Sequence, residues 1–189
     1  MAHYVIRFAR RTVVAALFVT AALAGITSGV LFAYASDLPQ IAALDNYAPS
    51  TITRVHAADG QGIGEFAIQR RILVGYDEMA PRLREAIVAA EDQRFFTHPG
   101  IDFIGVVRAM VANVANPGKR PEGASGLTQQ VAKNFLLTNQ ATLSRKIREA
   151  ILAFRIEETY SKERILELYM NEIYLGSGNY GVAQAAINY

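Results

Sequence analysis

Cysteine is absent from this chain of 189 residues. A disulfide framework, a thiol nucleophile and a zinc–thiolate site are therefore all excluded. A long basic tract is missing too, because 19 lysine and arginine residues face 17 aspartate and glutamate residues, a formal net charge of +2. A protein that binds duplex nucleic acid usually gathers its cations, so nucleic acid is not expected as a partner. Internal repeats and low-complexity tracts are also missing, which indicates one modest domain with accessories.

Charge is missing altogether from residues 13–35, which are almost wholly apolar or small. As a helix, these 23 residues would span about 35 Å, enough for a hydrocarbon core of about 30 Å. Three arginines precede the stretch, and the positive-inside rule then places the N-terminus in the cytoplasm. We therefore expect a single-pass membrane protein, with everything after the helix outside the cytoplasm.

A cleaved signal peptide is the competing interpretation of the same stretch. Ala33-Tyr34-Ala35 resembles a small-residue cleavage site. The apolar run is longer than the roughly 7–15 residues usual for a signal peptide, which favours an uncleaved anchor.

The chain is expected to divide into four parts. Residues 1–12 form a cytoplasmic tail and residues 13–35 a transmembrane helix. Residues 36–75 form a juxtamembrane linker with a small β element, and residues 76–189 the main domain. The last residues are apolar and helix-like with no terminating signal, so we expect the C-terminal part of this domain to be missing.

The small β element is predicted from two alternating segments around an Asp-Gly turn. Thr51–His56 and Gly62–Ile68 are the two strands, with Asp59 and Gly60 at the centre of the turn. Arg71–Gly75 is predicted as a third short strand.

Residues 76–189 have helical periodicity. Pro81 suits the first turn of a helix that ends near Glu91, and Gly176 fits a C-terminal cap. Further helices are predicted over 102–116, 127–137, 142–160, with Thr142 as N-cap, and from 161, with Ser161 as N-cap. The predicted apolar faces are Leu83, Ile87, Val88 and Ala90 in the first helix, Leu143, Ile147, Ile151 and Phe154 in the fourth, and Ile165, Leu168, Tyr169 and Ile173 in the fifth.

The segment 91–100 joins an acidic pair to an aromatic pair, a histidine and a Pro-Gly turn. A carboxylate at a helix end can lie at the mouth of a cleft, walled by apolar rings that raise its proton affinity, as a general base requires. The competing interpretation is an ordinary helix end, with Glu91 solvated and Phe95 and Phe96 in the core. His98 is expected to pack rather than bind metal, since no second histidine lies within ligand spacing.

Two further clusters favour an anion. The glycine-rich loop 123–126 leads into a helix, which presents free N–H groups and the positive end of a dipole, although its spacing to Lys133 is not that of a phosphate-binding Walker motif. Arg145 and Lys146 lie at a helix start, where the dipole disfavours cations unless an anion compensates. The alternative is a simple i,i+4 pair of Arg145 with Glu149 on a solvated face.

Two carboxylates, Glu91 and Glu149, therefore accompany a basic, amide-rich surface. That combination suits a glycosyl or phosphoryl centre. Arg108, alone on an otherwise apolar helix, either extends to solvent or points into this site.

Five motifs in order resemble those of the bacterial peptidoglycan glycosyltransferase family (glycosyltransferase family 51), the N-terminal module of class A penicillin-binding proteins. The resemblance covers residues 37–189. The motifs are Glu91-Asp92-x-x-Phe95-x-x-His98-x-Gly100, Gly123-Ala124-Ser125 with Thr128-Gln129-Gln130 and Lys133-Asn134, Arg145-Lys146-x-x-Glu149, residues 162–171, and Tyr174-Leu175-Gly176 with Gly181-Val182-x-x-Ala185-Ala186.

The resemblance implies a mainly α, lysozyme-like lobe that polymerises lipid II into β-1,4 glycan strands with inversion and releases undecaprenyl diphosphate. It implies that Glu91 is the general base and that Glu149 orients the donor or binds a divalent cation, Mg²⁺ or Mn²⁺. No organic cofactor is implied, because the donor carries its own diphosphate. Its implied substrate-binding residues are Arg108, Ser125, Thr128, Gln129, Gln130, Lys133, Asn134, Arg145 and Lys146. Implied partners are lipid II, the growing glycan strand, the membrane and cell-wall synthesis proteins.

Two features depart from the family pattern. Gly126 stands where the family usually has threonine, so the loop lacks a hydroxyl and is expected to be looser. The chain also lacks a Ser-x-x-Lys nucleophile motif, so it is not expected to bind β-lactams or to hold a transpeptidase domain. The alternatives are a lytic muramidase, which would use a glutamic acid of raised pKa on glycan strands, and a non-catalytic fragment that acts as an assembly partner.

Overall fold

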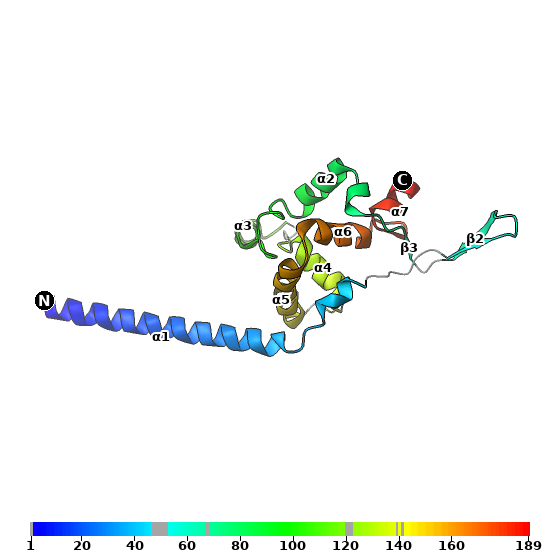
Figure 1. Ribbon diagram of the computed structural model, residues 1–189. Helices are drawn as coiled ribbons and strands as arrows, with labels where there is room; N and C mark the ends of the chain where they lie inside the picture. The colour runs from blue at the N-terminus through cyan, green and yellow to red at the C-terminus, as the bar shows by residue number, and fades with distance from the viewer. Residues whose placement is uncertain (1, 47–52, 67–68, 120–122, 139, 141) are drawn as a thin grey trace. The chain divides into compact units, whose positions relative to one another are not determined.

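The computed structural model describes residues 2–46, 53–66, 69–119, 123–138, 140 and 142–189. The described chain is mainly helical, as the sequence predicts, with small paired strands (Figure 1). It divides into two units, residues 1–38 and 39–189.

The first unit is one long helix, α1, from Ala2 to Ala35. Arg7–Ala35 is long and apolar enough to cross a membrane, with a mean hydropathy of 2.1 in its most apolar window. A signal sequence near an N-terminus can have the same length and composition, so its topology stays a prediction. The threonine hydroxyls of this helix donate to carbonyl oxygens one turn back, as in Thr20 to Ala16 at 2.9 Å, so these donors are satisfied within the helix.

The second unit begins with segments that were expected to be a linker. A short 3₁₀ helix, η1, spans Ile41–Leu44, and Leu44 is fully buried against the helical lobe. The Tyr160 hydroxyl donates to the Ile41 carbonyl and to Asp45 at 3.2 and 2.8 Å, which holds this segment on the lobe. A second 3₁₀ helix, η2, spans Tyr76–Glu78.

The predicted hairpin is present. Strands β1 (Thr53–His56) and β2 (Gly62–Phe66) pair antiparallel, and every described side chain in them is exposed. Gly60 has φ +86°, and the Asp59 carboxylate accepts from the Gln61 N–H at 3.0 Å, as an Asp-Gly turn requires. Residues 51, 52, 67 and 68 of the predicted strands lie outside the described residues.

The third predicted strand is wrong in length and in partner. Strand β3 covers only Arg70–Arg71, and it pairs in parallel with β4 (Asn179–Tyr180) rather than with the hairpin. The buried Arg71 guanidinium explains this, because it donates to Glu172 at 2.5 Å and lies 5.1 Å from the centre of the Tyr180 ring. Those partners lie about 100 residues away in sequence, beyond the reach of a local pattern.

The helices of the lobe begin and end close to their predicted positions. Pro81 occupies the first turn of its helix, and the hydroxyls of Thr142 and Ser161 accept from backbone N–H groups three residues on, as predicted for N-caps. Gly176 is no helix cap, since α6 already ends at Glu172 and Gly176, with φ +93°, lies in the turn before β4. The helices are α2 (Pro81–Glu91), α3 (Phe103–Ala115), α4 (Leu127–Leu136), α5 (Leu143–Thr159), α6 (Lys162–Glu172) and α7 (Val182–Asn188).

The core forms where α4 packs against α5 and α6. The predicted face of α5 is partly wrong, because Leu143 is 78% exposed and the buried face instead holds Glu149 and Ile156. The predicted face of α2 is only partly right, because Ile87 and Val88 are half-buried, whereas Leu83 and Ala90 are exposed. Fully buried core side chains are Leu127 and Val131 in α4, Leu152 and Ile156 in α5, and Ile165, Leu166 and Met170 in α6.

Candidate active site

Glu91 is the last residue of α2. Its side chain is exposed, and its carboxylate accepts a hydrogen bond from the Gln130 Nε2 of α4 at 3.0 Å. Phe95 is fully buried, whereas Phe96 is 51% exposed. The competing interpretation was therefore right about the exposure of Glu91 and the burial of Phe95 and wrong about Phe96.

Asp92 and His98 form a buried pair directly behind Glu91. The His98 Nε2 donates to both carboxylate oxygens of Asp92, at 3.0 and 2.9 Å. One of those oxygens also accepts from the Leu127 N–H at 3.1 Å. Asp92 thus caps the first turn of α4, where Gly126 at the N-cap position has no side chain to do so. His98 is buried, as expected of a packing histidine.

Position 126, where the family usually has threonine, has no room for a side chain in this structure. A Cβ at Gly126 would lie 2.3 Å from the Asp92 Oδ2. The missing side chain thus leaves room for the Asp92 carboxylate to approach the helix start. Gly126 itself is buried.

A polar cavity of about 160 Å³ lies beside Glu91. Arg108 of α3 and Ser125 of the loop line it together with Glu91, so the structure brings these three predicted site residues together. Asp102 also lines it, and that carboxylate pairs with Arg94 at 3.2 Å. The backbone N–H of Gly105 is the largest influence on Asp102 and lowers the pKa of its carboxyl below 3.8.

Glu149 is buried on α5, with 2% of its side chain exposed. It accepts from Arg145 and from the Lys146 Nζ at 2.8 Å, so the predicted i,i+4 pair is present. The face is not simply solvated, however, because the carboxylate lies in the core. One buried acid therefore holds two cations at the start of α5, where the helix dipole would repel them.

Lys146 connects this cluster to the glycine-rich loop. Its Nζ donates to the Ser125 hydroxyl at 2.5 Å. Burial, then the positive charges of Arg145 and Lys133, lowers the pKa of Lys146 below 10.5. The three cations therefore stand close enough to repel one another, and Glu149 is the carboxylate that both Arg145 and Lys146 contact. Such a cluster favours an anionic ligand.

Thr128 and Gln129 are buried away from the open surface. The Thr128 hydroxyl donates to Glu157 of α5 at 2.5 Å, and the Gln129 Oε1 accepts from the Gly126 N–H at 3.2 Å. These contacts are structural, and the substrate contact predicted for both stays untested. Asn134 is exposed on α4.

A divalent cation does not fit the donor set around Glu149. Its two carboxylate oxygens already accept from Arg145 and Lys146, whose charges repel a cation. Among the residues that the structure describes, no group of three or more histidine, aspartate or glutamate side chains lies together in a metal-binding arrangement.

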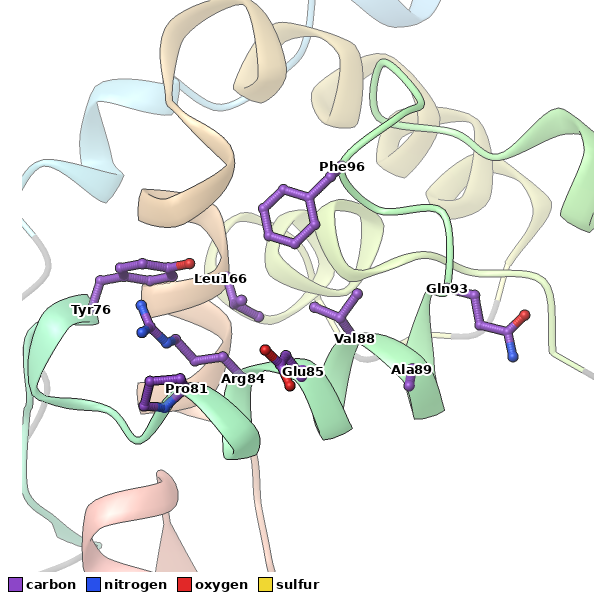
Figure 2. Close-up of a pocket in the computed structure, with 9 residues that line it drawn as sticks. All are labelled: Tyr76, Pro81, Arg84, Glu85, Val88, Ala89, Gln93, Phe96 and Leu166. Atoms are coloured by element: carbon purple, nitrogen blue, oxygen red, sulfur yellow. The ribbon is translucent and has the colours of Figure 1, made fainter.

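A larger cavity of about 570 Å³ lies along α2 (Figure 2). Its floor is apolar, with Phe96 directed toward Val88 and Leu166. At its other end the Arg84 guanidinium lies 4.1 Å from the centre of the Tyr76 ring. Gln93 lines both cavities, so the segment after Glu91 separates them.

Sequence reasoning missed the capping role of Asp92 and the position of Tyr169. An acidic residue six positions before a histidine carries no local signal of a buried pair. Tyr169 was predicted to face inward, which is confirmed, but nothing in its neighbours indicated that its hydroxyl would have no hydrogen-bond partner among the described residues.

Comparison with known proteins defines the class to which this fold and site belong. The transglycosylase family model matches residues 59–189, and the chain belongs to that family. This confirms the resemblance to the glycosyltransferase module of class A penicillin-binding proteins and the lysozyme-like helical fold.

The two curated relatives described next are both penicillin-binding proteins 1A. The chain is 47% identical over 167 residues to penicillin-binding protein 1A of Rickettsia felis, covering 87% of the chain and 21% of that protein. It is 45% identical over 162 residues to penicillin-binding protein 1A of Neisseria lactamica, covering 86% of the chain and 20% of that protein. The chain thus spans about a fifth of the length of these relatives.

Proposed function

We propose that this chain is a membrane-anchored peptidoglycan glycosyltransferase that polymerises lipid II. The acceptor's sugar 4-hydroxyl oxygen attacks the donor's anomeric carbon from the face opposite the diphosphate. A β-1,4 bond forms, the bond from that carbon to the diphosphate oxygen breaks, and Glu91 takes the hydroxyl proton. Undecaprenyl diphosphate leaves.

The observation that carries this proposal is that loop 123–126 joins two features: the exposed carboxylate of Glu91, and the cluster of cations formed by Lys133, Arg145 and Lys146. Glu91 and Ser125 line the same cavity, and Ser125 contacts Lys146. A base must reach a hydroxyl proton; Glu91 accepts a hydrogen bond from Gln130, and its side chain is otherwise exposed in the described part of the chain. Lys133, Arg145 and Lys146 are suited to stabilise the charge that develops on a departing diphosphate.

An exposed apolar surface supports a substrate that carries a lipid. Helix α3 places Arg108 and Ala109 on the polar cavity. Elsewhere on the same helix the large apolar side chains are exposed: Ile104, Val107, Met110, Val111 and Val114 are each at least 60% exposed. Such a face is suited to the surface of a bilayer, where the undecaprenyl chain lies. A candidate membrane-spanning helix, α1, accords with the same location.

Labelled lipid II supplied to the purified full chain in detergent tests the proposal. The wild type is expected to make glycan polymer, and Glu91→Gln should lower the rate by more than about 100-fold, because the amide cannot accept the proton. Glu85→Gln is the matched control, since Glu85 is also exposed on α2 but lines the other cavity.

A loss below about tenfold in Glu91→Gln would sink the role of Glu91 as the base. Shortening of preformed glycan would instead indicate the muramidase. A folded wild type that neither builds nor shortens glycan would favour an assembly partner.

A further inference from the structure

The side chain of Glu91 is not held in place by its own helix. Glu91 is the last residue of α2, and its side chain is exposed. An exposed glutamate loses conformational entropy when it is fixed in one orientation. A base, however, acts only when its carboxylate is held within reach of the reacting hydroxyl. A contact from another element therefore has to orient it.

Two hydrogen bonds attach the end of α2 to the start of α4. The Gln130 Nε2 donates to the Glu91 Oε2 at 3.0 Å, and the Leu127 N–H donates to the Asp92 Oδ2 at 3.1 Å. Leu127 is the first residue of α4 and Gln130 the fourth, so both donors come from one helical turn. The two adjacent acids are thus held at two points by a helix that lies 35 and 39 residues away in sequence.

The chemistry of the contact fixes which end of the Gln130 amide faces Glu91. An ionised carboxylate only accepts hydrogen bonds, so the amide nitrogen, and not the amide oxygen, has to face it. The bond uses the Oε2 atom of Glu91. Within the part of the chain that the structure describes, Oε1 is then the atom left to accept a proton from a hydroxyl in the cavity that Glu91 lines.

Gln130 is carried by a well-packed part of the lobe. Helix α4 packs against α5 and α6, and Leu127 and Val131 of α4 are fully buried. Gln130 itself is half-buried. A donor on a packed helix holds its acceptor more precisely than a donor on a loop does.

We propose that Gln130 is a positioning residue, whose amide holds the Glu91 carboxylate in the orientation from which it takes the hydroxyl proton. This inference rests on the proposed function, in which Glu91 is the base. It differs from the substrate contact that the family resemblance implies for Gln130. A positioning residue acts through Glu91 on the rate of the chemical step, whereas a substrate contact acts on affinity.

Gln130→Met removes the amide and keeps a side chain of similar length. With labelled lipid II and the full chain in detergent, kcat should fall by about 10–100-fold, because a catalytic group misplaced by about 1 Å loses about that much rate. KM should change by less than about twofold. A rise in KM with kcat unchanged would show a substrate contact and would overturn the inference.

Gln129→Met is the matched control, because the Gln129 Oε1 accepts from the Gly126 N–H, within α4 and its N-cap. Both substitutions are also made in a Glu91→Asp background, which keeps a carboxylate but draws it back from Gln130 by one methylene. There Gln130→Met should cost less than about twofold, since the contact is already lost, whereas Gln129→Met should cost the same factor in both backgrounds. An equal loss for Gln130→Met in both backgrounds overturns the inference.

A further measurement does not depend on polymerisation. The side-chain amide signals of Gln130 can be followed by NMR in nitrogen-15-glutamine protein in detergent and assigned with Gln130→Met. They should move in Glu91→Ala, which removes the acceptor, and stay in place in Glu85→Ala, which changes another exposed glutamate of α2. Signals that stay in place in Glu91→Ala overturn the inference whether or not the wild type makes polymer. Signals that move in a chain that makes no polymer support the contact and count against the proposed function alone.

Discussion

Replacing Asp92 by alanine tests whether the buried pair behind Glu91 supports the site. The side chain of Asp92 is 3% exposed and accepts from the His98 Nε2 and the Leu127 N–H. Alanine leaves both donors buried without an acceptor, at a cost of about 1–3 kcal/mol each. The free energy of unfolding should therefore fall by about 2–6 kcal/mol.

Each kcal/mol lowers the thermal midpoint of a chain of this size by about 2–4 °C, so the expected fall is about 4–24 °C. It can be followed by far-ultraviolet circular dichroism of the full chain in detergent. Asp92→Asn keeps one acceptor oxygen and should lose about half as much. Asp77→Asn is the control, because Asp77 is exposed in η2, and its midpoint should not move measurably. A fall of less than about 2 °C in Asp92→Ala would refute the reasoning.

The remaining predictions concern a cation and a backbone position. The affinity of the wild type for inorganic diphosphate should fall as pH rises through the lowered pKa of Lys146, because the ammonium loses its charge. Lys146→Arg should keep its affinity at alkaline pH, because the guanidinium stays charged. Calorimetry that shows the same fall in affinity in both proteins would contradict this. Gly100→Ala should destabilise more than Gly60→Ala in urea unfolding. Both glycines have positive φ, so an alanine at either position should cost about 1–2 kcal/mol in backbone strain. At Gly100 a Cβ would also lie 2.9 Å from backbone atoms of Ala153, which should cost about 1–3 kcal/mol more. Equal losses of stability in the two variants would argue against that contact.

The helices of the lobe could be predicted because their signals are local. Pro81, Thr142 and Ser161 each act within one turn of their own helix, so neighbouring residues suffice to place the boundaries. The errors share a different origin. Gly176 carries a cap signal but lies in a turn, and Arg70–Arg71 pairs with a strand from the other end of the lobe.

The sequence could predict which residues belong to the candidate site, but not which of them lie together or which contacts they make. Glu91, Ser125 and Arg108 were identified from three separate segments, and the structure places all three at one cavity. Thr128 was identified by its motif, yet its hydroxyl is buried against Glu157, because the side of α4 that faces the core depends on how α5 packs.

The sequence by itself determined the helices and their caps, the apolar segment long enough to span a membrane, and the family, because these follow from residues close together along the chain and from motifs in a given order. Only the tertiary structure decided which side chains meet. Glu91 gains Gln130 as its donor, Glu149 becomes a buried counter-charge for two cations, and the hydroxyl of Tyr169 is buried without a partner among the described residues. These outcomes depend on the packing of α2, α4, α5 and α6, which joins positions tens of residues apart that no local pattern relates.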